Sequence, residues 1–541
     1  MKKSSKKING TVINEKLLLC INILCITLVL WIVFCLFFLS DTGYACNNRK
    51  YIPHNIIMFL IIGILISAMI FFKKRFDISL NQTSFGSFVN KYFFFILGIG
   101  TLLLFAFQIY VSQHIYFYTG WDVWGLTDTA LSAEWNDGLN VNWEIYTYKR
   151  YPNNVMLTLV FIVIKDICRI FSFDPYFGFI IGSCISITLA CMFTALCVNK
   201  LTGNKNIALV IWLLSLVLCG SSPWMTIPYS DSYGILFPII ALFFYLSLKT
   251  CKTLLSRIMF GAAFGFFAAF GYLIKPSAII ILIAVIIVEA FGFVFHKENR
   301  KKLLISAAAI IVASVTVLGC NALIQEHFGL RNSDEKFSMT HWFMMGLKEE
   351  TNGVISGEDV HFSASIKDPD ERTKTEIKVA IERIKEKGAW GMVKHTARKT
   401  LTNFNDGRLG WGFEGPFYRI LMPEKNAMST FLRNIFYDTG EYFVVANSLS
   451  HFVWLLCWVL VLVVLFWKKK GESRNIDPKY SILFLALVGH ILFVMLFEAR
   501  ARYSFIYSPL LLTTASLALH KISQLKPNKT LKKQEGDNDA T

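Results

Sequence analysis

The chain has 541 residues, of which 54% are hydrophobic and only 17% are charged, and it contains 48 Phe and 13 Trp. This composition excludes an ordinary soluble domain, which carries more charge, and a disordered chain, which has few aromatic residues. The formal net charge of +17 would suit a nucleic-acid-binding protein, but the basic residues gather in short loops between apolar segments, which is a pattern of membrane topology.

Twelve apolar segments follow one another along the chain, and most approach the roughly 20 residues needed to cross about 30 Å of hydrocarbon. They span residues 17–39, 54–72, 92–112, 176–198, 206–222, 233–248, 257–273, 276–295, 302–323, 450–468, 479–497 and 503–520. The first is too long for a cleaved signal peptide, and no small-residue cleavage pattern follows it, so we expect it to be retained. The sequence therefore predicts an all-α, multi-pass membrane protein with a bundle of about 12 transmembrane helices.

Basic residues mark alternate loops and predict how the chain is oriented. They precede the first segment and recur at 73–75, 200–205, 249–252, 297–302 and 468–470. Because basic loops stay in the cytoplasm, we expect both termini there, including a polar tail at 526–541, with the protein in the cell membrane. The apolar stretch 155–171 carries three charged residues at one end. It is expected to lie along the outer interface, because a crossing there would turn every later basic loop outward.

Two of the outward regions are long enough to fold. The first, 113–153, is rich in Trp, Tyr and acidic residues and belongs to a catalytic transmembrane module at 1–323. The second, 324–449, has the polarity of a soluble domain and precedes the last transmembrane helices at 450–525. Within it, 367–400 predicts a pair of charged amphipathic helices broken at Gly388. Its apolar residues at helical spacing are Ile377, Ala380, Ile381 and Ile384. The aromatic stretch 403–420 predicts a loop packed on the membrane face.

The acidic residues of the first outer region are candidates for activating a hydroxyl group. Asp122 and Asp128 lie among Trp121 and Trp124, and a carboxylate within hydrogen-bonding reach can accept a proton while nearby rings stack on a sugar. Their spacing of six residues does not place them on one helix face. For a single carboxylate in an outer loop, simple solvation is the common alternative, and for the Trp residues it is anchoring at the interface.

Fixed positive charges on the same side are candidates for binding a phosphate. Arg500 and Arg502 begin a late segment, where guanidinium groups and free backbone N–H groups both favour an anion. Lys275 sits at the outer end of another segment, where an unpaired charge is costly. The alternatives are that Arg500 pairs with Glu498 and that Lys275 extends to water.

Three further residues on this side are candidates for contact with a ligand. Tyr229 and Asp231 lie in the motif Pro228-Tyr229-Ser230-Asp231-Ser232, and Asp231 would alternatively cap the following helix. His341 stands beside Trp342 and would alternatively be a packing residue.

These motifs resemble those of the polytopic glycosyltransferases with the GT-C fold. Trp121-Asp122 resembles the Trp-Asp of the first loop in the GPI mannosyltransferase group and its bacterial relatives, and the motif at 228–232 is similar to that group's Pro-Tyr-(Ser/Thr)-Glu-Ser, with Asp in place of Glu. Residues 498–503, Glu-Ala-Arg-Ala-Arg-Tyr, resemble the Arg-Tyr element of bacterial family-39-like enzymes. The basic-Pro-Pro element of those enzymes is replaced here by Tyr151-Pro152-Asn153-Asn154.

The resemblance implies an enzyme that transfers a sugar from a polyprenyl-phosphate donor to a polysaccharide, teichoic acid or glycolipid on the outer face of a bacterial membrane. Together with the residue chemistry above, the resemblance predicts Asp122 and Asp128 as catalytic residues, Arg500, Arg502 and Lys275 as ligands of the donor phosphate, and Trp121, Trp124, Tyr229, Asp231 and His341 as contacts of the acceptor or sugar. A lipid-linked polysaccharide polymerase or ligase and a transporter or flippase remain alternatives. No metal site is expected from the residues, although dependence on a divalent cation stays open, and no nucleic-acid partner is expected.

Overall fold

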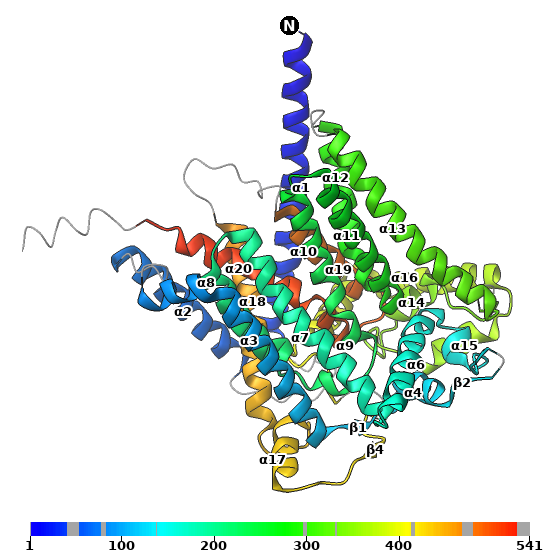
Figure 1. The fold of residues 1–541 in the computed structure, drawn as a ribbon. Coiled ribbons are helices and arrows are strands. Elements are labelled where there is room, and N and C mark those ends of the chain that lie inside the picture. Colours follow the sequence, from blue (N-terminus) through cyan, green and yellow to red (C-terminus); the bar gives the residue numbers. More distant parts are fainter. Residues whose placement is uncertain are drawn as a thin grey trace, which may run out of the picture.

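A computed structural model describes residues 2–40, 54–76, 83–136, 138–295, 300–330, 333–412, 417–467 and 480–526. The predicted inner loops at 73–91, 296–302 and 468–479 fall partly or wholly outside these described residues, as does nearly all of the tail at 526–541. The long helices lie side by side in a bundle (Figure 1). They are α1 (Lys2–Phe38), α2 (Asn55–Phe76), α3 (Ser84–Ile115), α7 (Pro175–Thr202), α8 (Lys205–Ser215), α10 (Leu236–Thr250), α11 (Leu254–Ile274), α12 (Ile280–Phe295), α13 (Arg300–His327), α18 (Phe443–Phe466), α19 (Ser481–Leu496) and α20 (Ser508–Ser523).

Nine helical stretches among the described residues are long and apolar enough to cross a membrane. They are Leu19–Phe38, Asn55–Arg75, Ser84–Ile115, Pro175–Thr202, Ser230–Thr250, Leu254–Ile274, Pro276–Val294, Arg300–His327 and Phe443–Phe466. The all-α, multi-pass prediction is confirmed, whereas the count of twelve is not.

The other three predicted segments also form helices, but shorter ones. Lys205–Gly220 and Ser481–Leu496 are apolar helices of 10–17 residues, and α20 has 16 residues. At 1.5 Å per residue, 16 residues cover about 24 Å, which is short of the hydrocarbon thickness. The start of the predicted segment 503–520 is instead a tight 3-10 helix, η8 (Ala501–Tyr507).

Apolar side chains cover the outside of several of these helices. On α3, Leu102 and Leu103 are 69% and 65% exposed, and on α13 Val312 is 66% exposed. The candidate span of α7, by contrast, is mostly buried inside the bundle. Exposed apolar faces on peripheral helices are stable only in an apolar solvent, so the outer surface of the bundle suits a bilayer.

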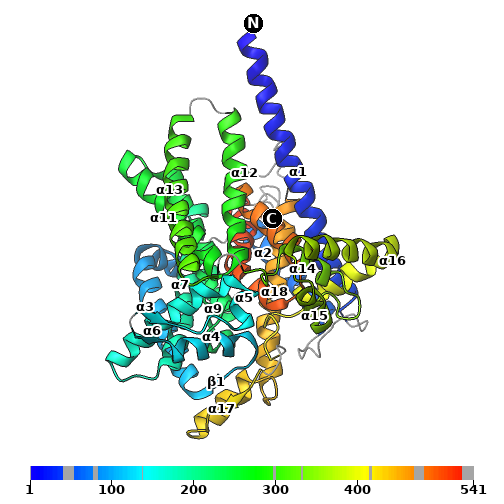
Figure 2. The ribbon, with the colours of Figure 1, turned by 90° about the vertical axis from the view of Figure 1, so that its right-hand side faces the viewer.

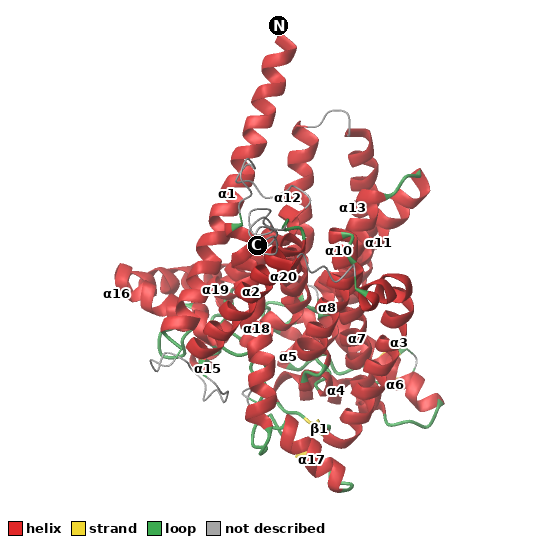
Figure 3. Cartoon of the chain, turned by 90° about the vertical axis from the view of Figure 1, so that its left-hand side faces the viewer, coloured by secondary structure: helices red, strands yellow, loops and turns green. Residues whose placement is uncertain are grey.

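The remaining elements gather away from the end at which α1 starts (Figures 1 and 2). The first group comprises β1 (Phe117–Tyr118), α4 (Trp121–Ser132), β2 (Glu134–Trp135), β3 (Leu139–Asn140), α5 (Tyr146–Lys149), η2 (Pro152–Asn154) and α6 (Val155–Ile170). Between the long helices lie η3 (Leu216–Gly220), η4 (Pro223–Thr226), α9 (Ser230–Gly234) and η5 (Pro276–Ile279). The last group comprises α14 (Met339–Gly346), α15 (Gly357–Ser365), α16 (Pro369–Phe404), β4 (Ile420–Leu421) and α17 (Ala427–Phe436). The few strands are short, and helices dominate throughout (Figure 3).

The two predicted outer regions contact each other and the bundle. Phe117 and Tyr118 of β1 pair with Leu421 and Ile420 of β4 in an antiparallel ladder. Helix α6, which corresponds to the predicted interfacial stretch 155–171, is not among the candidate spans. It packs against α4 and α7, and its buried Lys165 donates a hydrogen bond to the carbonyl of Ala133.

The break predicted in the charged helix pair is present. Gly388 has φ 58° and ψ −176° inside α16, a conformation that L-residues avoid. The expected apolar face, however, is mostly exposed: only Ala380 is buried, while Ile377 and Ile381 are 40% and 45% exposed. The buried side of α16 is instead polar, since Arg383 donates to both carboxylate oxygens of Asp359 at 2.7 and 2.8 Å.

Candidate functional site

Four segments that are far apart in the sequence meet at one place beside the bundle. Asp122 lies in the first turn of α4, Asp231 in α9, Lys275 between α11 and η5, and Arg502 in η8. Helix α9 packs against both η8 and α11. The short helix α9 immediately precedes α10, and η8 immediately precedes α20, so the breaks at the starts of these two apolar helices bring the polar residues together.

The carboxylate of Asp231 is at the centre of this cluster and is fully buried. Its Oδ1 contacts the ammonium group of Lys275, and its Oδ2 accepts a hydrogen bond from Nη1 of Arg502 at 2.7 Å. Both cations are themselves buried. Lys275 therefore does not extend to water, and Asp231 is an ion-pair partner in addition to lying in the first turn of its helix. Breaking a buried pair by removing one partner costs about 3–5 kcal/mol, because the other charge is left without compensation.

Aromatic rings surround the two cations. The guanidinium of Arg502 lies 4.8 Å from the ring centroid of Trp121, 5.2 Å from that of Tyr229 and 5.1 Å from that of Tyr503. The ammonium of Lys275 lies 4.6 Å from the Tyr503 ring. Each ring face attracts a cation, more strongly where water is excluded. The predicted residues Trp121 and Tyr229 thus form a wall of the same cluster.

Asp122 faces this wall and differs electrostatically from Asp231. Its Oδ2 accepts a hydrogen bond from the Tyr229 hydroxyl at 3.3 Å. Burial, together with the nearby negative charge of Glu498, raises the pKa of Asp122, and the charge of Arg502 offsets this only in part. A carboxyl group whose pKa is raised towards the working pH suits proton transfer.

The backbone beside Asp122 is strained. Trp121 has φ 45°, which is unfavourable for a residue with a Cβ atom. Its indole Nε1 donates to Thr119 Oγ1 at 3.0 Å, and its ring packs edge-on against Tyr229 at 4.8 Å between centroids. Such strain persists only where surrounding contacts fix it, and it is common at functional sites.

Glu498 and Arg500 form a second ion pair next to the cluster. Arg500 Nε donates to Glu498 Oε1 at 2.9 Å, and the Tyr503 hydroxyl donates to Oε2 at 2.7 Å. Burial raises the pKa of Glu498, but Arg500 and the Tyr503 hydrogen bond outweigh that effect and hold the pKa below its ordinary value. The alternative considered for Arg500, pairing with Glu498, is thus present in the structure.

The structure does not bring every candidate residue to this cluster. Asp128 is exposed, six residues and about 240° around α4 from Asp122. The ring of Trp124 instead contacts Arg419, whose guanidinium lies 3.7 Å from the ring centroid. His341 is buried on α14, where Nδ1 is 2.8 Å from Ser363 Oγ and its ring packs against Phe337 and Trp342. Burial lowers the pKa of His341 to about 4, so it is neutral at physiological pH.

A feature that the motifs did not indicate is a clamp between the second outer region and the segment that carries the arginines. Lys399 of α16 is 1% exposed and donates to the carbonyls of Gly346 at 2.8 Å and Phe497 at 2.6 Å. Ala499 N donates to Gly353 O at 2.7 Å. A Cβ atom at Gly346 would lie 2.6 Å from the Phe497 carbonyl oxygen. In the sequence, Lys399 is only a lysine within a basic helix, and such a lysine would ordinarily be interpreted as exposed to solvent.

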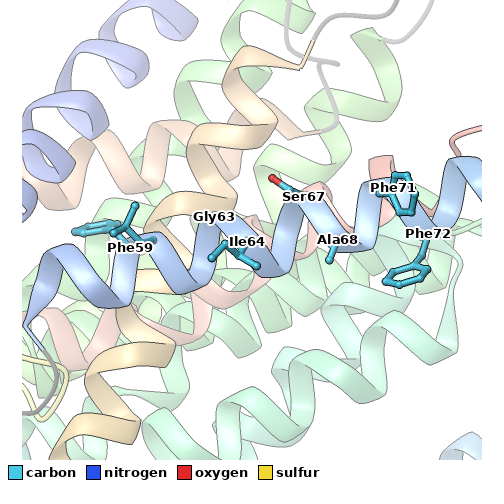
Figure 4. Close-up of a pocket in the computed structure, with 8 residues that line it drawn as sticks. Phe59, Gly63, Ile64, Ser67, Ala68, Phe71 and Phe72 are labelled. Atoms are coloured by element: carbon cyan, nitrogen blue, oxygen red, sulfur yellow. The ribbon is translucent and has the colours of Figure 1, made fainter.

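Two apolar hollows occur on helices of the bundle, and neither is lined by residues of the charged cluster. One runs along α2 past Phe59, Gly63, Ile64, Ser67 and Phe71 (Figure 4). The other is a groove of about 820 Å³ between α11 and α13, with Phe266, Phe270 and Val312 among its lining residues. Among the described residues, no group of three or more His, Cys, Asp or Glu side chains is placed to hold a metal ion.

Comparison with known proteins agrees with the membrane architecture. The profile of a family described as "Conserved hypothetical integral membrane protein" matches residues 13–523. The chain belongs to this family. No curated protein sequence and no solved structure gives a significant match. Membership establishes an integral membrane protein with several apolar helices, and the chemistry of this family member has to be argued from the cluster itself.

Proposed function

We propose that this protein transfers a sugar from a polyprenyl-phosphate donor to the hydroxyl group of a glycan or glycolipid acceptor. The observation that supports this best is the cluster in which a carboxylate of raised pKa, Asp122, lies near the cation Arg502, while Arg502 shares the carboxylate of Asp231 with Lys275. Activation of the acceptor hydroxyl requires a carboxylate that can take up its proton, and release of a lipid phosphate requires positive charge near the leaving group.

In the proposed reaction, Asp122 accepts the proton of the acceptor hydroxyl. The acceptor oxygen forms a bond to the anomeric carbon of the sugar while the bond from that carbon to the phosphate oxygen breaks. The electron pair leaves with the lipid phosphate, and attack opposite the leaving group inverts the anomeric configuration. Arg502 offers a planar pair of N–H donors and Lys275 a point charge to the departing phosphate.

The charge balance of the cluster fits this sequence of events. Asp231 is paired with two cations, Lys275 and Arg502. With Asp122 ionised, these four groups have no net charge, so protonation of Asp122 leaves one positive charge for the donor phosphate. Protonation of Asp122 during the reaction therefore strengthens the attraction for the phosphate that leaves. The rings of Trp121 and Tyr229 supply faces on which a sugar can stack.

The proposed orientation puts this cluster on the outer side of a bacterial cell membrane and both termini in the cytoplasm. The basic loops and the resemblance to enzymes fed by lipid-linked sugars motivate it. Single cysteines labelled with an impermeant reagent would test it, with cysteines at position 470 expected to be protected and cysteines at position 136 expected to react. Labelling at 470 from outside would overturn the orientation.

The function is tested with the purified full-length protein and radiolabelled undecaprenyl-phosphate sugars, offered together with membrane glycolipid acceptors. Asp122→Asn should lower transfer by about 10²–10⁴-fold, because it keeps the shape of the side chain but cannot accept the proton. Asp128→Asn is the matched control, since Asp128 is exposed on the same helix.

Three outcomes separate the proposal from its alternatives. Transfer of a single sugar that depends on Asp122 supports it. Transfer of preassembled chains would indicate a polymerase or ligase instead. Movement of intact lipid-linked sugar across vesicles without any transfer would indicate a flippase, and undiminished transfer by Asp122→Asn would exclude Asp122 as the base.

A further inference from the structure

Arg408 lies in a loop between α16 and α17 whose backbone is tightly fixed. The carboxylate of Asp406 accepts hydrogen bonds from the backbone N–H groups of Arg408 at 2.9 Å and Gly410 at 2.7 Å. Leu409 has φ 55°, an unfavourable value for a residue with a Cβ. At Gly407 a Cβ atom would lie 2.3 Å from Cα of His451, so no other residue fits without movement of the backbone.

The guanidinium of Arg408 is buried but lacks the partners that a buried cation needs. The residue is 5% exposed, and its Nε and Nη1 have no hydrogen-bond partner among the described residues. The rings of Phe436 and Phe443 lie beside it, with centroids 5.7 and 5.5 Å away, and Asp406 supplies a nearby negative charge. Burial lowers its pKa to about 10, so it carries its charge at physiological pH.

Arg408 is exceptional among the buried cations of the described chain. The others, Lys165, Lys275, Lys348, Arg372, Lys399 and Arg502, each donate to at least one oxygen atom. A buried charge without hydrogen bonds costs several kcal/mol, of which two cation–π contacts return only part. The arrangement is therefore incomplete without an oxygen-bearing partner for Nε and Nη1.

We propose that Arg408 binds the phosphate group of an anionic phospholipid. Its guanidinium lies over Phe443, the first residue of the candidate span α18, which puts it level with the headgroups. Val445 and Leu449, on another face of α18, are 72% and 56% exposed, so the start of this helix borders an apolar environment. A guanidinium binds phosphate through two parallel N–H donors, and either unpartnered nitrogen, Nε or Nη1, can form such a pair with Nη2.

This site is distinct from the charged cluster but contacts it. The Cβ position of Gly410 would be 3.4 Å from Cβ of Ala501 and 3.8 Å from the backbone nitrogen of Arg502. The carbonyl of Arg408 also accepts a hydrogen bond from the indole of Trp224 at 3.0 Å. A lipid held by Arg408 would therefore stabilise the loop that supports Arg502, whether or not the protein transfers sugars.

The test compares thermal unfolding of the full-length protein in detergent with and without dioleoyl phosphatidylglycerol. Dioleoylglycerol, which lacks the phosphate, and inorganic phosphate serve as separate arms. We expect the phospholipid alone to raise the unfolding temperature of the natural protein. Arg408→Met should be at least as stable as the natural protein without lipid, because it removes a buried charge whose Nε and Nη1 lack hydrogen bonds, and should lose the response to phospholipid.

Two further variants keep the result interpretable. Arg408→Lys retains the charge without the planar pair of donors and should weaken the apparent affinity for phosphatidylglycerol by at least about tenfold. Arg419→Gln, which removes a guanidinium held over Trp124, is the matched control and should respond as the natural protein does. If Arg408→Met does not fold, the comparison rests on Arg408→Lys. An equal lipid response in natural protein and Arg408 variants, or a response to inorganic phosphate but not to phospholipid, would overturn the proposal.

Discussion

Replacing Asp231 by Asn tests whether the charged cluster is held together as the structure indicates. The carboxylate pairs with Arg502 at 2.7 Å and contacts Lys275, and all three side chains are buried. At 2.7 Å and an effective dielectric constant of 20, the attraction of two unit charges is about 6 kcal/mol. Relaxation and water entry reduce this value, and mutational experience with buried pairs suggests a net loss of about 3–5 kcal/mol.

The assay is the free energy of unfolding in mixed micelles, measured for Asp231→Asn, Lys275→Met and the double variant. The double variant should recover part of the loss, because it leaves only Arg502 without its carboxylate and removes the repulsion between the two cations. Asp128→Asn, on the exposed face of α4, should change stability by no more than about 0.5 kcal/mol. A loss below about 1 kcal/mol for Asp231→Asn, or strictly additive effects, would contradict the ion-pair geometry.

Three further predictions follow from the described residues. If Asp122 is the base, the acidic limb of the transfer rate should lie above the ordinary carboxyl pKa near 4, since burial raises its pKa; a limb at or below 4 would contradict this assignment. Burial lowers the pKa values of His341 and His395 to about 4. The free energy of unfolding of the region at 333–404 should therefore fall by up to about 3 kcal/mol per histidine as pH falls from 6.5 to 4. The measurement is faster hydrogen exchange in this region, and His361→Gln, at an exposed position, is the control. Gly388→Ala should destabilise by about 1–2 kcal/mol because of the positive φ; an unchanged melting temperature would contradict the kink.

The membrane architecture could be predicted because the length and hydropathy of each apolar segment indicate a membrane helix. Each of the twelve apolar segments corresponds to a helix, but apolarity does not reveal where a helix becomes a 3-10 turn. Residues 501–507 are mostly apolar or aromatic, with Arg502 among them, yet they form η8. This turn places Arg502 against Asp231. The break at Gly388 could be predicted because glycine is the residue that tolerates such a conformation.

Some members of the charged cluster could be predicted from the sequence, but their contacts could not, and Asp128, Trp124 and His341 lie outside it. Short motifs identified Asp122, Asp231, Lys275 and Arg502, and the structure gathers these four. Sequence spacing alone could not indicate that Asp231 pairs with both cations, because the partners are 44 and 271 residues away. Lys399 and Arg408 were not predicted as buried or functional residues, because their burial depends on how distant segments pack. In the sequence each resembles an ordinary basic residue.

The clamp formed by Lys399 and Gly353 has a consequence for how events at the two outer regions can influence each other. Two hydrogen bonds, from Lys399 to the Phe497 carbonyl and from Ala499 N to the Gly353 carbonyl, reach the segment just before Arg500 and Arg502. A third joins Lys399 to the Gly346 carbonyl. A molecule that binds to α14 or α16 and shifts this backbone would thereby reposition both guanidinium groups. The region at 333–404 is thus mechanically coupled to the segment that carries both arginines.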